Sequence, residues 1–70
     1  MPIKENDLVR TLVEKGRWPA GQIGPVVDVC GGGRGITIEV WNEDRYPVDV
    51  VTYDVDEVEV VDDGIMPATN

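Results

Sequence analysis

The stretch that decides the fold is Ala20-Gly21-Gln22-Ile23-Gly24-Pro25-Val26-Val27-Asp28-Val29-Cys30. Gly21 and Gly24 lead directly into a run that is rich in valine. Glycine tolerates positive φ and close backbone approach, so this pair predicts a sharp chain reversal that feeds a strand. The later segments read as further short strands, which together favour a very small β-barrel. This stretch indicates an architecture and no activity.

The length and composition of the chain limit the size of its core and the kinds of cross-link and metal site that it can form. Its 70 residues allow one domain with a small core. Cys30 is the only cysteine and histidine is absent, which excludes an internal disulfide and a Cys/His zinc site. We therefore predict no metal and no other cofactor. One free thiol without a visible secretory leader favours a cytoplasmic protein, and no uncharged run is long enough to span a bilayer.

The net charge of −8 is unevenly distributed along the chain. Residues 1–35 carry five basic and four acidic side chains, whereas residues 36–70 carry ten acidic side chains and Arg45 as their one base. Such a surface repels phosphate backbones and argues against binding of DNA or RNA. It attracts a basic protein partner and accelerates their encounter. The alternative, that the charge only keeps a small barrel soluble, stays open.

The hydrophobic pattern predicts five short strands and no long helix. A loop over residues 14–22, with Trp18 near its tip, follows the first strand, and residues 54–57 form one helical turn before the last strand. The strands are expected over residues 7–13, 23–30, 36–41, 46–53 and 58–61. This layout is typical of a five-stranded, all-β, SH3-like barrel. Residues 1–6 are then a lead-in, and residues 62–70 a flexible tail.

Alternation assigns the inward side of two of these strands. In the third strand the inward residues are Ile36, Ile38 and Val40. In the fourth strand Val48 and Val50 are expected inward and Asp49 outward. Pro25 cannot donate a ladder hydrogen bond, which places it at an edge or a bulge of the second strand. Residues 42–45 have the composition of a turn.

Four motifs run in order through residues 7–61. They are Asp7-Leu8-Val9, Gly21-Gln22-Ile23-Gly24-Pro25-Val26-Val27-Asp28-Val29, Tyr46-Pro47-Val48-Asp49-Val50 and Asp56-Glu57-Val58-Glu59-Val60. In these motifs the chain resembles a domain-of-unknown-function family of short bacterial proteins with an SH3-like barrel. Related barrels occur in the photosystem I stromal subunit, the nitrile hydratase β-subunit and KOW modules. The resemblance implies a docking module and no particular chemistry.

Other patterns have weaker functional interpretations. Gly31-Gly32-Gly33-Arg34-Gly35 lacks the Lys-Ser/Thr of a phosphate-binding P-loop, so we expect a flexible hairpin loop. The acidic residues near the end of the chain do not have the spacing of an EF-hand calcium loop. Cys30 has no activating base near it in sequence, serine is absent, and a barrel of this size has little room for a cleft. We therefore predict that the protein is not an enzyme.

The aromatic residues lie near loops or at positions predicted to face outward, and Trp and Tyr are favoured anchors of protein interfaces. Two alternatives stay open: Trp18 as a lid over one end of the barrel, and Trp41 packed across a strand pair. The predicted partner-binding residues combine these anchors with the acids of the helical turn. They are Trp18, Trp41, Tyr46, Tyr53, Asp54, Asp56 and Glu57.

The sequence thus predicts a small acidic protein–protein interaction module that docks on a basic partner. It is interpreted as an antitoxin-like or regulatory accessory subunit. One alternative is a self-associating structural module, because a domain of this size gains stability from a homo-oligomer. A second alternative is a KOW-type nucleic-acid-associated module, against which the acidic second half of the chain argues.

Overall fold

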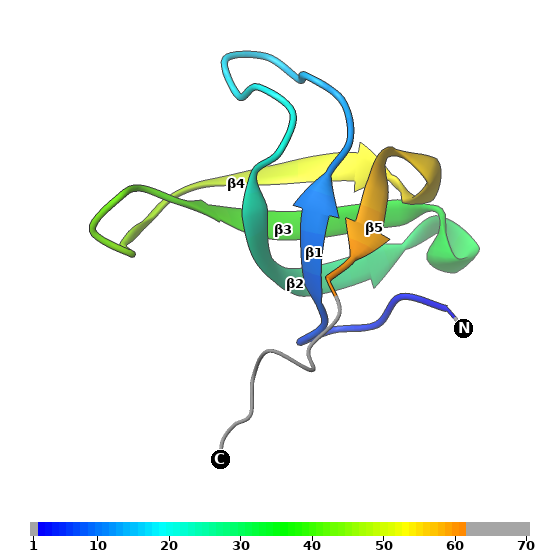
Figure 1. Ribbon diagram of the computed structural model, residues 1–70. Helices are drawn as coiled ribbons and strands as arrows, with labels where there is room; N and C mark the ends of the chain where they lie inside the picture. Colours follow the sequence, from blue (N-terminus) through cyan, green and yellow to red (C-terminus); the bar gives the residue numbers. More distant parts are fainter. Residues whose placement is uncertain (1, 62–70) are drawn as a thin grey trace.

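The computed structural model describes residues 2–61, which form one antiparallel sheet of five strands (Figure 1). The strands are β1 (Leu8–Thr11), β2 (Ile23–Cys30), β3 (Gly35–Trp41), β4 (Pro47–Asp54) and β5 (Val58–Val60). Their order in the sheet is β4-β3-β2-β1-β5. Two 3-10 turns join them, η1 (Gly31–Gly33) and η2 (Val55–Glu57). The predicted all-β class and the helical turn before the last strand are confirmed, and the predicted tail lies outside the described residues.

The sheet has two halves, β4-β3-β2 and β2-β1-β5. Strand β2 belongs to both halves, and it bends sharply between them (Figure 1). Its first residues pair with β1 and its later residues pair with β3. A Cβ atom at Gly24 would overlap the backbone carbonyl oxygen of Glu39, so glycine is what lets β3 pass this close. The register also shifts at Val27, and such a bulge bends a strand. Pro25, predicted at an edge or bulge, lies between these two features.

The core lies between the two halves of the bent sheet. The inward residues predicted for β3 are confirmed, because Ile36, Ile38 and Val40 are completely buried. Burial of an aliphatic side chain of this size contributes about 2 kcal/mol. The other buried apolar residues come from all four remaining strands and are Val9, Val26, Tyr53 and Val58.

The predicted face of β4 is wrong. Val48 and Val50 are 43% and 59% exposed. Asp49, Val51 and Tyr53 are the residues that lie opposite the buried side chains of β3, and directly paired residues of an antiparallel ladder share a face. The register shifts where β4 begins, and a shift of one residue exchanges the two faces of a strand. Tyr53 is only 1% exposed, so its predicted outward position is wrong as well.

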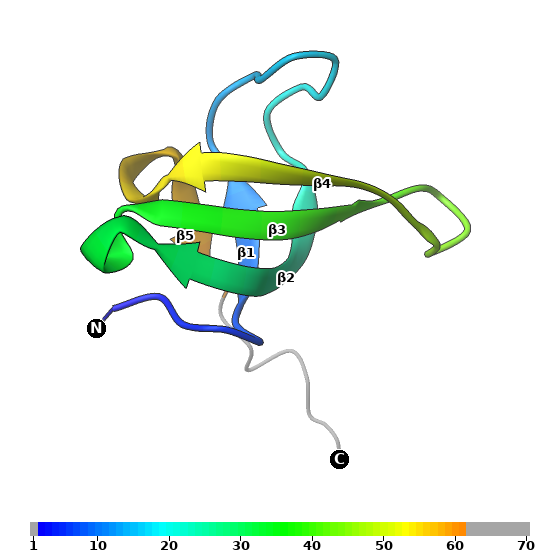
Figure 2. The same ribbon diagram turned by 180° about the vertical axis from the view of Figure 1, so that it is seen from behind.

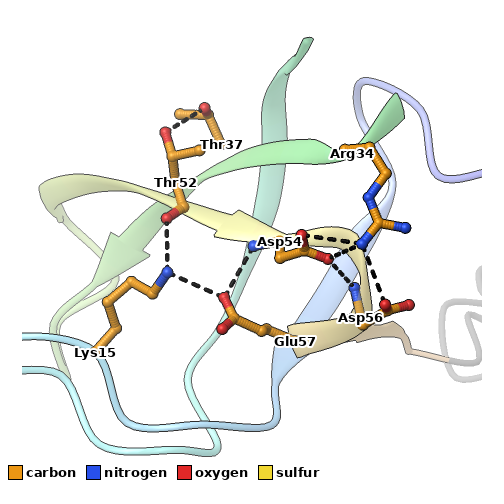
Figure 3. A network of polar contacts seen from close by, with 7 residues as sticks. All are labelled: Lys15, Arg34, Thr37, Thr52, Asp54, Asp56 and Glu57. Carbon is orange, nitrogen blue, oxygen red and sulfur yellow. Dashed lines mark hydrogen bonds and ion pairs between the residues drawn. The ribbon is translucent and has the colours of Figure 1, made fainter. Parts of the chain in front are cut away.

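Hydrogen bonds do not close the sheet into a barrel. Strands β4 and β5 are its two edges and are not paired with each other. Lys15 of the long β1–β2 loop contacts β4 and the turn before β5: its Nζ lies 3.4 Å from the Thr52 carbonyl oxygen of β4 and 3.0 Å from Oε1 of Glu57 in η2 (Figure 3). Leu12 leaves β1 and donates its N–H to the Glu57 carbonyl, 2.8 Å away. Strand β1 (Leu8–Thr11) is shorter at both ends than the predicted residues 7–13.

The hairpin between β3 and β4 projects beyond the rest of the sheet (Figure 2). Its turn is shaped by Asn42, whose side-chain oxygen accepts hydrogen bonds from the N–H groups of Asp44 (2.8 Å) and Tyr46 (3.0 Å). Arg45 completes the turn with a φ of 68°. The turn predicted over residues 42–45 is confirmed, and it presents the side chains that follow it to solvent.

Candidate protein-binding surface

Trp18 lies in the long loop and is half-buried against the core. Its Nε1 donates a 2.7 Å hydrogen bond to the carboxylate of Asp49 on β4, and the guanidinium of Arg17 lies 5.0 Å from the centre of its ring. The N–H of the indole and part of its ring are thus used within the chain. This position matches the lid interpretation of Trp18 more closely than the anchor interpretation.

Tyr53 lies inside the core, away from any surface that a partner could reach. Lys15 covers its ring, with Nζ 5.1 Å from the ring centre. Burial raises the pKa of the Tyr53 phenol above its ordinary value, and the positive charge of Lys15 opposes this rise. The phenol oxygen makes no hydrogen bond with any other residue in the range 2–61. Tyr53 therefore does not qualify as a partner-binding residue in this fold.

The three acids of the helical turn are engaged within the chain (Figure 3). Asp54 and Glu57 form a capping box around η2, because Asp54 accepts from the N–H of Asp56 (3.0 Å) and Glu57 accepts from the N–H of Asp54 (2.9 Å). Arg34 lies 2.9 Å from Asp54 and 3.3 Å from Asp56, and Lys15 pairs with Glu57.

These contacts lower two pKa values. For Asp54 the main cause is the hydrogen bond from the Asp56 N–H, and for Glu57 it is the hydrogen bond from the Asp54 N–H followed by that from Lys15. The turn is a structural unit that holds β5 in place. Because two cations already neutralise part of its charge, it is a weaker attractant for a basic partner than the sequence predicts.

Trp41 and Tyr46 are exposed, as predicted. Trp41 ends β3 with 39% of its surface exposed, and its Nε1 donates a 2.9 Å hydrogen bond to Oε1 of Glu39. Tyr46 follows the hairpin turn and is 67% exposed. The ladder places Glu39 opposite Val50, so the indole lies on the same side of the sheet as the exposed Val50 of β4.

Glu39, Trp41 and Val50 belong to one surface, which we call the outer face: the side of β2, β3 and β4 that points away from β1 and β5 (Figure 2). The ladder places the exposed Trp41 and Val50 on it, whereas the exposed Val27 and Val48 lie at the register shifts of β2 and β4, and Tyr46 lies in the hairpin turn. The polar residues of the outer face include Glu39 and Asp28, and Asp28 lies opposite Thr37 in the ladder. The hydroxyl groups of Thr37 and Thr52 are hydrogen-bonded to each other at 2.7 Å. Exposed apolar side chains gathered on one face mark interaction surfaces.

The outer face also carries carboxylates that form no ion pair with residues 2–61. Ion pairs within residues 2–61 engage five of the six basic side chains: Lys4, Arg10, Lys15, Arg17 and Arg34. Arg45, in the hairpin turn, is the remaining base. None of these ion pairs includes Asp28 or Glu39. The face therefore combines apolar side chains with carboxylates that are outside the ion pairs of the described residues.

The exposure of Trp41 and Tyr46 agrees with the sequence prediction, whereas Glu39 and Val50 were missed as residues beside Trp41. One signal was present: residues two apart on a strand share a face, so the exposed Trp41 implies that Glu39 lies beside it. Val50 was missed because its alternation with Asp49 suggested a buried face. Only the register of the ladder reverses that assignment.

Other kinds of site find no support in the described part of the chain. Residues 2–61 contain no group of three or more carboxylate, cysteine or histidine side chains positioned to hold a metal ion. The Cys30 thiol is exposed at the end of β2. Among the same residues no helix has the length and apolar character to cross a membrane. Comparisons with protein-family models, curated proteins and solved structures found no match for this chain.

Proposed function

We propose that this protein is a non-enzymatic protein–protein interaction module that binds a basic partner through the outer face. The observation that carries the proposal is the exposure of Trp41 and Val50 on one face, next to the carboxylate of Glu39, which is in no ion pair with residues 2–61. Aromatic side chains dominate binding energy at protein interfaces, and aliphatic neighbours exclude water around them.

The charge of the chain supports a basic partner. At a net charge of −8 the protein attracts cationic surfaces and repels nucleic acids, which also disfavours the KOW-type alternative. Five basic side chains are held in ion pairs elsewhere in the chain, so the carboxylates of the outer face keep their attraction for an incoming cation. An antitoxin-like or regulatory accessory subunit, bound to a more basic protein in the cytoplasm, has this character.

We further propose that the fold is a variant of the SH3-like barrel, as in the family of short bacterial proteins that the sequence resembles. The features that support this are the strand order β4-β3-β2-β1-β5, the shared and bent β2, the long loop after β1 and the 3-10 turn before β5. Barrels of this kind serve as docking modules, which agrees with the proposed binding role at the level of fold.

A test compares three tagged baits: the wild-type protein, Val50→Asn and Val60→Asn. Val60 is an exposed valine on β5, away from the outer face, so its variant is a matched control. The supporting result is a basic protein that the wild type and Val60→Asn capture but Val50→Asn loses, with capture weakened by added salt. Capture that is the same with all three baits contradicts the proposal.

The same variants test self-association. If sedimentation shows a dimer that dissociates on dilution and is lost in Val50→Asn, the outer face binds a second copy and the proposal of a basic partner is wrong. Two copies of an acidic face repel one another, so we expect a monomer at physiological salt.

A further inference from the structure

The contacts of Trp18 show how this protein binds a guanidinium group within its own chain. The indole donates its N–H to Oδ2 of Asp49 at 2.7 Å. Arg17 lies over the indole at 5.0 Å from the ring centre, and its guanidinium nitrogen is 3.8 Å from that same carboxylate oxygen. One ring and one carboxylate thus hold one cation together, through the π-face and through charge.

A second group of three residues repeats the combination. Nζ of Lys15 lies 5.1 Å from the centre of the Tyr53 ring and 3.0 Å from Oε1 of Glu57. Both cations come from the long loop, and both help to attach this loop to the sheet.

Trp41 and Glu39 form a second indole–carboxylate pair of the kind made by Trp18 and Asp49. The indole N–H donates to Oε1 of Glu39 at 2.9 Å, as the Trp18 indole does to Asp49. Within residues 2–61 no cation lies over the Trp41 ring, and Glu39 takes part in no ion pair. Oε2 of Glu39 accepts no hydrogen bond from these residues, which leaves it available to a donor from outside.

We propose that Trp41 and Glu39 form a binding site for an arginine side chain of the basic partner, an inference that rests on the proposed function of the outer face. The planar guanidinium stacks on the indole and donates to the Glu39 carboxylate. Its methylene stem lies over Val50, which the ladder places opposite Glu39. Lysine fits less well because a compact, strongly hydrated ammonium neither stacks nor forms parallel hydrogen bonds.

The experiment uses the full chain and the capped peptide acetyl-Gly-Arg-Gly-amide, with lysine and citrulline peptides for comparison. The two indole N–H signals are followed by NMR during titration, and Trp41→Phe assigns them. We expect a saturable shift of the Trp41 signal with the arginine peptide, a smaller shift with lysine and none with uncharged citrulline. The Trp18 signal should stay in place because its site is already filled by Arg17.

The matched pair of variants is Glu39→Gln and Glu43→Gln, which change the net charge equally. Glu43 is an exposed acid of the hairpin turn that is in no ion pair with residues 2–61. We expect Glu39→Gln to weaken binding of the arginine peptide about fivefold, as loss of an exposed ion pair does, and Glu43→Gln to weaken it by less than about twofold. Equal weakening by both variants, an equal response to citrulline, or no saturable shift would overturn the inference.

Failure of this inference can be told apart from failure of the proposed function. If Val50→Asn abolishes partner capture while Glu39→Gln changes neither capture nor peptide binding, the outer face binds a partner and the arginine site is wrong. If neither variant changes capture and the arginine peptide produces no shift, both the site and the proposed function are wrong.

Discussion

The indole N–H of Trp18 donates a 2.7 Å hydrogen bond to the carboxylate of Asp49, 31 positions later in the chain. The other oxygen of this carboxylate accepts from the N–H of Val50 at 2.8 Å. Both bonds favour the ionised form, and the Trp18 bond is the larger cause of the lowered pKa of Asp49. This pair fastens the long loop to the edge strand β4.

Replacement of Asp49 should loosen the loop. In Asp49→Ala the indole of Trp18 loses its acceptor and Arg17 loses its counter-ion, so we expect faster amide hydrogen exchange across residues 12–22 and a lower melting temperature. Glu14→Ala, which removes an exposed carboxylate of the same loop, is the control. Unchanged exchange in Asp49→Ala would show that the loop is held by other contacts.

Glu57 should contribute to stability in a pH-dependent manner. Its folded pKa is lowered from an ordinary value of 4.5, first by the Asp54 N–H and then by Lys15, so folding favours the ionised carboxylate. Its contribution is complete above the unfolded-state pKa and is lost as pH falls through the folded pKa. The free energy of unfolding, measured in urea, should therefore differ most between wild type and Glu57→Gln above about pH 5. The difference should shrink on acidification, and growth below pH 4.5 would contradict the assigned contacts.

Gly24→Ala should be strongly destabilising. The added methyl group meets the carbonyl oxygen of Glu39, a backbone atom that cannot move aside without disrupting β3. We expect a loss of about 3 kcal/mol, at the upper end for overpacking, in a domain whose total stability is about 5 kcal/mol or a little more. Gly16→Ala is the matched control: a new methyl group has open space there, and its φ of 59° costs about 1 kcal/mol. Equal losses for the two variants would contradict the close approach of β2 and β3.

Two neighbouring valines test the orientation of β4. Val51 packs against the core, whereas Val50 points outward. Val51→Thr places a hydroxyl on the buried side and should cost about 1 kcal/mol or more, while Val50→Thr should change the free energy of unfolding by less than about 0.5 kcal/mol. The effects are measured by urea denaturation. If Val50→Thr were the more destabilising variant, Val50 would face the core, as expected from the sequence.

Much of the fold could be predicted from local sequence. The bounds of β2 and the inward face of β3 follow from valine-rich and strictly alternating segments, Ile36 and Ile38 being buried as expected. The face of β4 could not be predicted, because valine occurs on both of its sides and the deciding register shift depends on the partner strand.

The candidate site was predictable only in part. Exposure of Trp41 and Tyr46 follows from their places beside a turn. The internal role of Asp54 and Glu57 was also within reach, since an Asp followed three residues later by Glu is the pattern of a capping box. The burial of Tyr53 and the bond from Trp18 to Asp49 depend on contacts between distant segments, which no local pattern specifies.

The strand order implies that the two halves of the sheet differ in the loop-closure entropy that is lost when their strands pair. Strand β1 pairs with β5, placing Val9 opposite Val60, so this ladder must close a loop of nearly the whole described chain. Consecutive hairpins join strands β2, β3 and β4. Their pairing therefore has a much smaller cost in loop-closure entropy. The outer face belongs entirely to these three strands. We therefore expect its backbone to assemble early, and a partner that binds there would stabilise the chain before its two terminal strands have met.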